Sequence, residues 1–499
     1  MREPLPRLLK PRRSASRRGV SPYRSVALRC LLSLSCLAPL SACDDQADPA
    51  RDKTAAEEAG ARGGALGGGV GGVGAAGAGA EAGAAVGGDR AGQVGPSCDE
   101  SRAPVVFAHG FLAAGDTWSR HVRRFTALGA CPERLVAFDW NSLQQNQDHA
   151  AALSERIDEL LAESGAEQID LIGHSAGGGL GYGLLSDSAR ALKVRRYVHI
   201  ASFPNEGPAG PEGSSVPTLN LRSLGDTTVE GADIPGATNV TLNEEDHYGV
   251  ATSFASFQAI YEFLYDERVE VDPLSAELSG DSVSLSGKLV TLGENAVISG
   301  AAVELWSLNA EGEREERVAE LSVDERGRYE REGLSRGARY ELAPLNTGEG
   351  APLVRYFIPP LLNSDPLLYL RAFPGPGTLA SVLVRQLPRD ESQSSLVVFN
   401  AHQAFLAGRD SLTLNGQELL TEEVASAEDT AIALFIFDVN GDGEPGGTLP
   451  LFESFPFLSV IDLPIDPLEA SPLRLSLNGQ EVTLPRAPSS EATLITVFP

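Results

Sequence analysis

The amino-acid sequence predicts an α/β fold, a mostly parallel sheet with helices on both faces, followed by an all-β part. Between Cys98 and Val271, apolar and β-branched runs alternate with segments of helical periodicity. This alternation is typical of parallel sheets with right-handed crossovers. After Asp272-Pro273 the long helical periods end, and short strand-like runs are separated by Gly, Asp and Pro. A chain of 499 residues is long enough for several domains.

Six strands and four helices are expected in the α/β part. The expected strands are 104–108, 134–139, 168–172, 194–201, 218–224 and 238–242. The expected helices are 117–128, 149–164, 177–192 and 253–267. The connection 203–217 is short and rich in Gly and Pro, so no helical cap fits there. We therefore expect a shallow site unless the C-terminal part covers it.

The segment Gly173-His174-Ser175-Ala176-Gly177 follows one of these strands and precedes a helix. A Gly-x-Ser-x-Gly motif in this context is typical of a nucleophile elbow, where the serine occupies a sharp, strained turn. Flanking glycines keep Cβ atoms away from the neighbouring strand and helix. The motif alone has low specificity in a chain with 53 glycines, and an ordinary Gly-rich loop is the alternative.

Three further motifs accompany this segment along the chain. His109-Gly110-Phe111 ends an upstream strand, Asp226 follows the strand 218–224, and His247 follows the strand 238–242. With four motifs in this order, the chain resembles the α/β-hydrolase family, and especially small bacterial lipases and esterases.

The resemblance implies a Ser-His-Asp mechanism of ester hydrolysis that requires no cofactor. Ser175 would attack the ester, His247 would carry the proton to the leaving alcohol, and Asp226 would hold the imidazole tautomer. The backbone N–H groups of Phe111 and Ala176 would form the oxyanion hole, which stabilises the negative oxygen of the tetrahedral intermediate.

Two other carboxylates compete with Asp226 for the place of the acid. Glu206 follows the preceding strand, where some lipases carry the acid. Asp246 adjoins His247 and is too close in sequence to orient its ring easily. The alternative for His247 is a surface histidine among acidic residues. The remaining histidines are His109, His121, His149, His174, His199 and His402.

The N-terminal segment 1–42 has the pattern of an export signal. A basic stretch precedes a short apolar run, and Leu40-Ser41-Ala42-Cys43 resembles a bacterial lipobox. The resemblance implies cleavage before Cys43, diacylation of its sulfur and anchoring in the bacterial cell envelope, on the periplasmic side or the cell surface. An ordinary secretory peptide is the alternative, and both interpretations export the protein. Residues 43–97 are rich in Gly and Ala and predict a flexible tether.

The mature chain is strongly acidic. The first 42 residues contain nine basic residues and one acidic residue, so their removal leaves 31 Lys and Arg against 67 Asp and Glu. This charge repels nucleic acid and argues against a nucleic-acid partner. With Cys43 lipidated, Cys98 and Cys131 remain as a pair in an oxidising compartment, either as a disulfide or as two free thiols. The sequence does not indicate an oligomeric state.

The C-terminal part is expected to form two β domains, 272–345 and 346–499. Within the first, Gly-Ala-x-Val-x-Leu, Asp-x-x-Gly-x-Tyr and Gly-Leu-x-x-Gly-x-x-Tyr-x-Leu resemble a carboxypeptidase regulatory-type β-sandwich. The second is expected to contain strands at 379–387, 395–400, 411–415, 431–437, 473–484 and 492–497. The arrangement is similar to lipases with a C-terminal lipid-binding β domain. That resemblance makes five aromatic residues candidates for acyl contact, with burial in the core as the alternative: Phe435, Phe437, Phe452, Phe455 and Phe457.

An acidic loop in the second β domain has part of a calcium-binding pattern. Asp438, Asn440 and Asp442 occupy positions 1, 3 and 5, and Gly443 occupies position 6. Position 12 is Leu449 rather than a bidentate Glu. The loop is therefore either a weak structural calcium site or an acidic turn.

The sequence is compatible with two classes of function. The first is an exported, membrane-tethered carboxylic-ester hydrolase acting on medium to long acyl esters such as triacylglycerols. A short-chain esterase or a polyester depolymerase is the alternative within this class. The second class is a non-catalytic surface binding or adhesion lipoprotein on a hydrolase scaffold.

Overall fold

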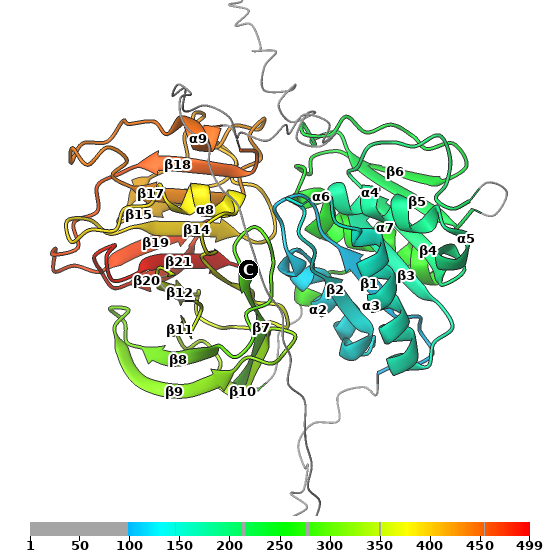
Figure 1. Ribbon diagram of the computed structural model, residues 1–499, viewed down its shortest axis with the longest axis horizontal. Coiled ribbons are helices and arrows are strands. Elements are labelled where there is room, and N and C mark those ends of the chain that lie inside the picture. Colours follow the sequence, from blue (N-terminus) through cyan, green and yellow to red (C-terminus); the bar gives the residue numbers. More distant parts are fainter. Residues whose placement is uncertain (1–97, 145, 212–214, 276–279, 349–350, 454) are drawn as a thin grey trace, which may run out of the picture. The chain divides into compact units, whose positions relative to one another are not determined.

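The computed structural model describes residues 98–499 except 145, 212–214, 276–279, 349–350 and 454 (Figure 1). The stretch Ser97–Pro499 belongs to one compact unit. The predicted export signal, the lipobox cysteine and the Gly/Ala-rich tether lie outside the described residues. Within the described ranges, every helix is too short or too polar to cross a bilayer.

The α/β region, residues 98–271, contains one six-stranded sheet in the order β2-β1-β3-β4-β5-β6. Its strands are β1 (Val105–Ala108), β2 (Leu135–Phe138), β3 (Ile169–His174), β4 (Val194–Ile200), β5 (Thr218–Ser223) and β6 (Thr238–Leu242). All neighbouring strands run parallel. The predicted α/β fold with a mostly parallel sheet is confirmed. The chain order reverses between β1 and β3, which is where open α/β sheets place their sites.

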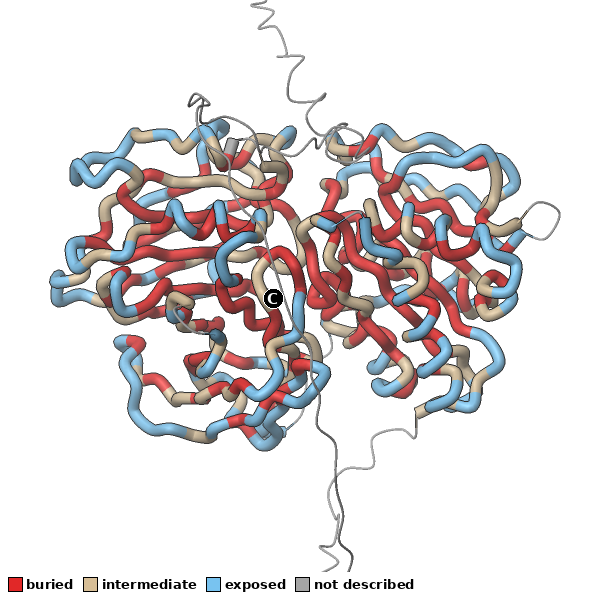
Figure 2. Tube along the Cα trace, in the orientation of Figure 1, coloured by how far each residue is buried: buried red, intermediate tan, exposed pale blue. Residues whose placement is uncertain are grey.

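Helices cover both faces of this sheet, because its strands are apolar on both sides. One apolar cluster joins Ile172 to side chains of α2 (Ser119–Ala127) and α7 (Phe254–Tyr265). The other joins Leu171 to side chains of α3 (His149–Ser164) and α4 (Ala176–Leu185). Adjacent residues of β3 thus enter opposite layers, and the buried strands lie between them (Figure 2). The shorter helices are η1 (Gly115–Trp118), η2 (Pro132–Arg134), α5 (Ser188–Ala191) and α6 (Gly249–Thr252).

The predicted helix 177–192 is two helices in the structure. The first ends at Leu185, and Asp187 starts the second by accepting hydrogen bonds from the N–H groups of Ala189 and Arg190, at 2.9 and 3.0 Å. An aspartate in this role satisfies helix-start donors, so it favours a new helix over a continuous one.

The β region, residues 272–499, contains three sheets. The largest has the order β18-β17-β14-β21-β12-β11-β8-β9, and the others are β10-β7-β13 and β16-β15-β19-β20. The strands up to residue 372 are β7 (Ser282–Thr291), β8 (Ala302–Leu308), β9 (Arg314–Ser322), β10 (Arg328–Ser335), β11 (Tyr340–Leu345), β12 (Val354–Phe357) and β13 (Leu370–Ala372). The later strands are β14 (Leu396–Asn400), β15 (Leu412–Leu414), β16 (Gln417–Glu418), β17 (Ala433–Phe437), β18 (Leu458–Asp462), β19 (Leu473–Leu477), β20 (Gln480–Leu484) and β21 (Thr493–Phe498). Three short helices complete the region: η3 (Pro273–Ser275), α8 (Leu379–Val384) and α9 (Pro450–Glu453).

The structure differs from the expected pair of β domains, because 272–345 and 346–499 share one sheet and one core. Strand β11 pairs with β8 on one side and with β12 on the other. One apolar cluster contains side chains from Val283 to Val497. A separate domain ending at 345 would leave an edge of β11 unpaired, and the following strand covers that edge instead.

Two local expectations for the β region also change. The segment 379–387, expected as a strand, starts with helix α8, whose N-terminus is capped reciprocally by Thr378 and Ser381. Phe435, Phe437 and Phe452 are at most 2 % exposed, so they belong to the core.

Candidate active site

Ser175 occupies the sharp turn between β3 and α4, at φ 53° and ψ −120°. Its N–H donates to the carbonyl of Ile200 at 2.9 Å, which fixes the turn against β4. A Cβ on Gly173 would collide with the carbonyl of Gly177, and a Cβ on Gly177 would collide with the carbonyl of Ala108. The two glycines are therefore needed for this turn, and a non-glycine residue at positive φ is the strained conformation expected of an elbow.

Ser175, His247 and Asp226 form one hydrogen-bonded chain. His247 Nε2 lies 3.0 Å from Ser175 Oγ, and His247 Nδ1 lies 2.8 Å from Asp226 Oδ2. A carboxylate only accepts, so Nδ1 donates to Asp226 and Nε2 accepts from the serine hydroxyl. The Ser175 and His247 side chains come from the β3–α4 turn and the β6–α6 loop. The sequence placed all three at loop positions, and the structure brings them together.

The carboxylate of Asp226 is held ionised in a buried place. Burial by itself raises its pKa, but the adjacent His247 and the N–H groups of Val229 and Thr228 together lower the pKa below 3.8. Thr228 and Val229 donate to Oδ1 at 2.8 and 3.1 Å, leaving Oδ2 for the imidazole. Glu206 is exposed, and Asp246 pairs with Arg409 at 2.7 Å rather than with the imidazole. The geometry therefore favours Asp226 over both rivals.

The loop that carries Phe111 lies directly against the elbow. A Cβ on Gly110 would lie 3.1 Å from the Cβ of Ser175, so the backbone of this loop approaches the serine closely. Ala176 is the first residue of α4, where backbone N–H groups have no partner within the helix. Both residues thus lie next to the serine in the fold, and the oxyanion hole made of their N–H groups stays a prediction.

Buried histidines surround the triad and stay neutral. Burial, and then the neighbouring His247, lower the pKa of His174 to about 3, and its Nε2 donates to the carbonyl of His247 at 2.8 Å. Burial lowers the pKa of His109 to about 4, and its Nδ1 donates to the carbonyl of Gly110 at 2.8 Å. Both rings thus act as neutral hydrogen-bond donors that fix the loops of His247 and Phe111.

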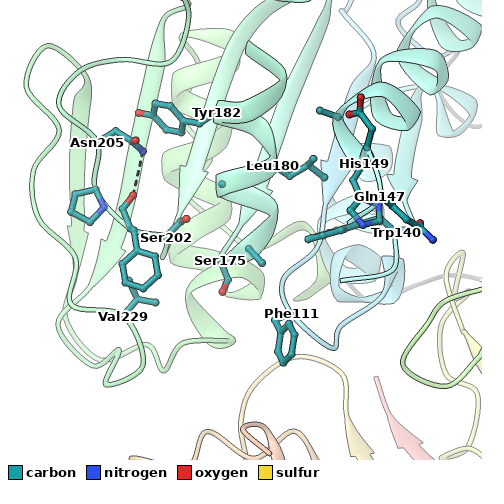
Figure 3. A pocket seen from close by; sticks show the side chains of 16 residues that line it. Phe111, Trp140, Gln147, His149, Ser175, Leu180, Tyr182, Ser202, Asn205 and Val229 are labelled. Carbon is teal, nitrogen blue, oxygen red and sulfur yellow. Dashed lines mark hydrogen bonds between the residues drawn. The ribbon is translucent and has the colours of Figure 1, made fainter. Parts of the chain in front are cut away.

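A pocket of about 520 Å³ opens at Ser175 (Figure 3). Its lining residues all lie between positions 111 and 229: Phe111, Trp140, Gln147, Asp148, His149, Ala150, Ser175, Ala176, Gly179, Leu180, Tyr182, Ser202, Phe203, Pro204, Asn205 and Val229. Aromatic and aliphatic side chains lie on both sides of the serine in this lining. Among the described residues, the β region contributes none to this lining, so it does not cover the site there.

The β region instead contacts the loops that carry the triad, which the sequence patterns did not indicate. Phe457 lies against the ring of His247, with centroids 5.8 Å apart and planes 10° apart. Thr228, beside the acid, shares a hydrogen bond of 3.0 Å with Thr430. Asn295 Nδ2 donates to the carbonyl of Ala113 at 2.8 Å, below the Phe111 loop. No local motif marks such contacts, because they join residues far apart in the chain.

Two other predicted sites lie away from the triad. Cys98 and Cys131 form a disulfide with Cα atoms 4.8 Å apart.

The carboxylate of Asp438 accepts from the N–H groups of Gly441 and Gly443 at 2.7 and 2.8 Å, and Asn440 Nδ2 donates to Asp442 at 2.9 Å. These bonds describe an acidic turn closed by its own backbone, and calcium binding there stays a prediction.

Comparisons with known proteins agree with this architecture. The model of the Alpha/beta hydrolase family matches residues 105–407. A second family model, described as a C-terminal domain, matches residues 382–498.

Several solved structures are similar to part of this chain at low identity. Bacillus licheniformis lipase BlEst2 is 15% identical, with a TM-score of 0.28 over 34% of this chain and 94% of that one. Aspergillus fumigatus lipase B is 15% identical, with a TM-score of 0.28 over 37% and 58% of the two chains. Carboxylesterase CesB from Bacillus subtilis is 13% identical, with a TM-score of 0.26 over 34% and 86%. Because the family model spans more than half of the sequence, the chain belongs to the alpha/beta hydrolase family.

Proposed function

We propose that this protein is an exported carboxylic-ester hydrolase that acts on medium to long acyl esters. The observation that carries the proposal is the hydrogen-bonded chain from Ser175 through His247 to Asp226, with the serine at the floor of a 520 Å³ pocket. A strained serine, an imidazole and a buried carboxylate in contact are the parts that acyl transfer needs.

The chemistry follows from the positions of these groups. Ser175 Oγ attacks the ester carbonyl carbon while His247 Nε2 takes its proton, and the carbonyl oxygen becomes negative. The N–H groups of Phe111 and Ala176 stabilise that oxygen. The protonated imidazole, stabilised by Asp226, then gives its proton to the leaving alcohol, and an acyl-serine remains. Water, deprotonated by the same imidazole, releases the acid and restores the serine.

Replacing Ser175 by Ala tests the mechanism. Hydrolysis of p-nitrophenyl butyrate should fall by roughly 10⁴-fold or more, because triad members act as a unit. Ser202→Ala is the matched control, since Ser202 lines the same pocket without touching the triad. A fluorophosphonate probe should label wild-type protein at Ser175. Folded protein that neither labels nor hydrolyses esters would favour a non-catalytic binding lipoprotein instead.

The apolar lining of the pocket supports the choice of acyl chain. Each methylene that leaves water contributes about 0.8 kcal/mol, so kcat/KM should rise about fourfold per added methylene until the lining is filled. Measurement of a series from acetate to palmitate esters reports where this rise ends. A maximum at acetate would identify a short-chain esterase, and selective cleavage of a polyester would identify a depolymerase.

Export and anchoring form the remaining part of the proposal and rest on the sequence before residue 44. Cys43→Ser should move the protein from the membrane fraction to the soluble fraction of the expressing bacterium. Mass spectrometry of the N-terminal peptide should show a diacylglyceryl group on wild-type Cys43. An unmodified mature terminus at another residue would indicate an ordinary secretory signal.

A further inference from the structure

Phe457, from the β region, packs nearly parallel to the imidazole of His247. The two ring planes differ by 10° and the centroids are 5.8 Å apart, within the range of aromatic contacts. Phe457 is 6 % exposed and immediately precedes β18, so the contact is buried. The ring therefore occupies a space beside the imidazole that water or a rotated His247 would otherwise fill.

The backbone holds Phe457 in this place against its own preference. Its φ is 71°, a conformation that is rare for a bulky residue and natural for glycine. Its carbonyl accepts from the N–H groups of Ile432 and Ala433 at 2.8 and 3.3 Å, which ties it to β17. Such conformations persist only where the surrounding structure imposes them, and they gather at functional sites.

The same part of the β region also binds the two loops that carry the acid and the base. Thr227 Oγ1 donates to the carbonyl of Ala427 at 2.6 Å, and Thr228 Oγ1 shares a bond of 3.0 Å with Thr430 Oγ1. On the base side, Arg409 pairs with Asp246 at 2.7 Å, one residue before His247. Residues 427–433 and Phe457 thus contact the loop of Asp226 and the ring of His247 from the same part of the β region.

The contact between Phe457 and His247 lies outside the set of residues that line the pocket. Phe457 is not among the residues that line the pocket around Ser175. On the imidazole, Asp226 fixes the Nδ1 edge, and the ring of His174 approaches at 4.9 Å with a 45° tilt. Phe457 supplies the one nearly parallel aromatic contact to His247 among the described residues.

We propose that Phe457 is a positioning residue, which holds the imidazole of His247 in line with Ser175 and makes the β region part of the catalytic centre. This inference rests on the proposed hydrolase function. It assigns the β region to the chemical step rather than to binding of the acyl chain. Loss of the ring should therefore lower kcat and leave KM nearly unchanged, because small displacements of a catalytic group reduce rate strongly.

The test compares Phe457→Gly with Phe452→Ala, using p-nitrophenyl butyrate and thermal unfolding. Glycine accepts φ 71° without strain, so Phe457→Gly removes the ring and relaxes the backbone. Phe452 is 1 % exposed and packs on Phe435 at 4.8 Å, so Phe452→Ala removes a buried aromatic ring of the same region away from the triad. We expect Phe457→Gly to lower kcat by on the order of 10-fold to 100-fold with KM within about twofold of wild type. Phe452→Ala should lower the melting temperature and keep kcat near wild type.

Two further variants complete the design. Phe457→Tyr keeps the aromatic face and should restore most of kcat, whereas Phe457→Leu keeps only apolar volume and should stay slow. Phe457→Leu also replaces Phe457→Gly if the glycine variant does not fold. Wild-type kcat in Phe457→Gly, or equal slowing by Phe452→Ala and Phe457→Gly, would overturn the inference. A wild-type protein without esterase activity or probe labelling would overturn the proposed function instead, so the two failures are distinguishable.

Discussion

The α/β region and the β region contribute to the candidate site in different ways. The α/β region supplies each group of the proposed reaction and the whole lining of the pocket, all between positions 111 and 247. The β region supplies side chains that contact those groups or their loops. Phe457 packs on His247, and Thr430 hydrogen-bonds to the loop of Asp226. The catalytic groups thus come from short motifs, whereas contacts between residues about two hundred positions apart hold these groups in place.

The contact between the two regions includes charged and polar groups with little exposure. Arg371 pairs with Asp116 at 2.7 Å, and both side chains are nearly buried. Asp139 accepts from Lys288 at 2.5 Å and from the hydroxyl of Tyr369 at 2.9 Å. Buried charges are tolerated when they are paired and hydrogen-bonded, and they are costly when one partner is lost. The two regions are therefore expected to be interdependent, and deletion of 346–499 would remove Arg371 from Asp116.

The largest expected effect tests the chemistry of the α/β region. Asp226→Asn should lower kcat by about 10⁴-fold, because the amide favours the wrong imidazole tautomer. Glu206→Gln is the control, since the structure leaves Glu206 exposed and away from His247. A normal rate in Asp226→Asn together with a large loss of rate in Glu206→Gln would identify Glu206 as the acid of the triad instead.

The next largest effect tests the dependence of one region on the other. Asp116→Ala should reduce the free energy of unfolding by about 3–5 kcal/mol, because Arg371 would remain buried without its partner. Lys193→Met is the control, since the Lys193–Asp158 pair is 30 % and 54 % exposed and should contribute less than about 1 kcal/mol. Denaturant unfolding measures both variants. Equal changes would mean that the contact between the regions adds little to stability.

A third effect concerns pH, since the α/β region holds six of the seven histidines. Burial depresses the pKa of His174 to about 3 and those of His109 and His199 to about 4, from 6.5. The unfolded chain therefore takes up these protons first. The fold therefore has its full stability with respect to these histidines above pH 6.5. As the pH decreases toward 4, the free energy of unfolding falls by on the order of 1 kcal/mol per pH unit for each histidine.

Hydrogen exchange at decreasing pH checks this expectation by region. Amides of the six-stranded sheet should lose protection as the pH falls, and those of the eight-stranded sheet should follow because the two regions are interdependent. Stability that does not change between pH 7 and pH 4.5 would mean that these histidines are not held neutral by the fold.

The smallest effect tests the support beneath the Phe111 loop. Asn295 has φ 55°, so Asn295→Gly keeps the backbone and removes the bonds to Ala113 and Trp140. We expect a loss of about 1–3 kcal/mol in unfolding free energy, because buried carbonyls lose their donor. Asn346→Gly is the matched control at φ 57°, because Asn346 is exposed and should change stability little. A similar loss in both variants would assign the effect to backbone entropy.

The α/β fold and the members of the site could be predicted from local patterns. Runs of apolar and β-branched residues identified all six strands of the sheet. For the inner strands the reason is that a parallel strand buried on both faces has to be apolar throughout, whereas the edge strand β6 is largely exposed. Gly173 and Gly177 marked the elbow, because the turn around Ser175 has no room for a Cβ at either position. Asp226 and His247 followed strands whose ends meet at one edge of the sheet, which is a consequence of parallel topology.

Only the tertiary structure decided between alternatives that look the same locally. It placed Asp226 rather than Glu206 on the imidazole and merged two expected β domains into one sheet. It also set Phe457, one of several similar aromatic residues, against His247, while Phe435, Phe437 and Phe452 entered the core. Periodicity and turn residues report interactions over a few positions. Strand pairing and ring packing depend on which distant surfaces meet, and that is determined by the packing of the whole chain.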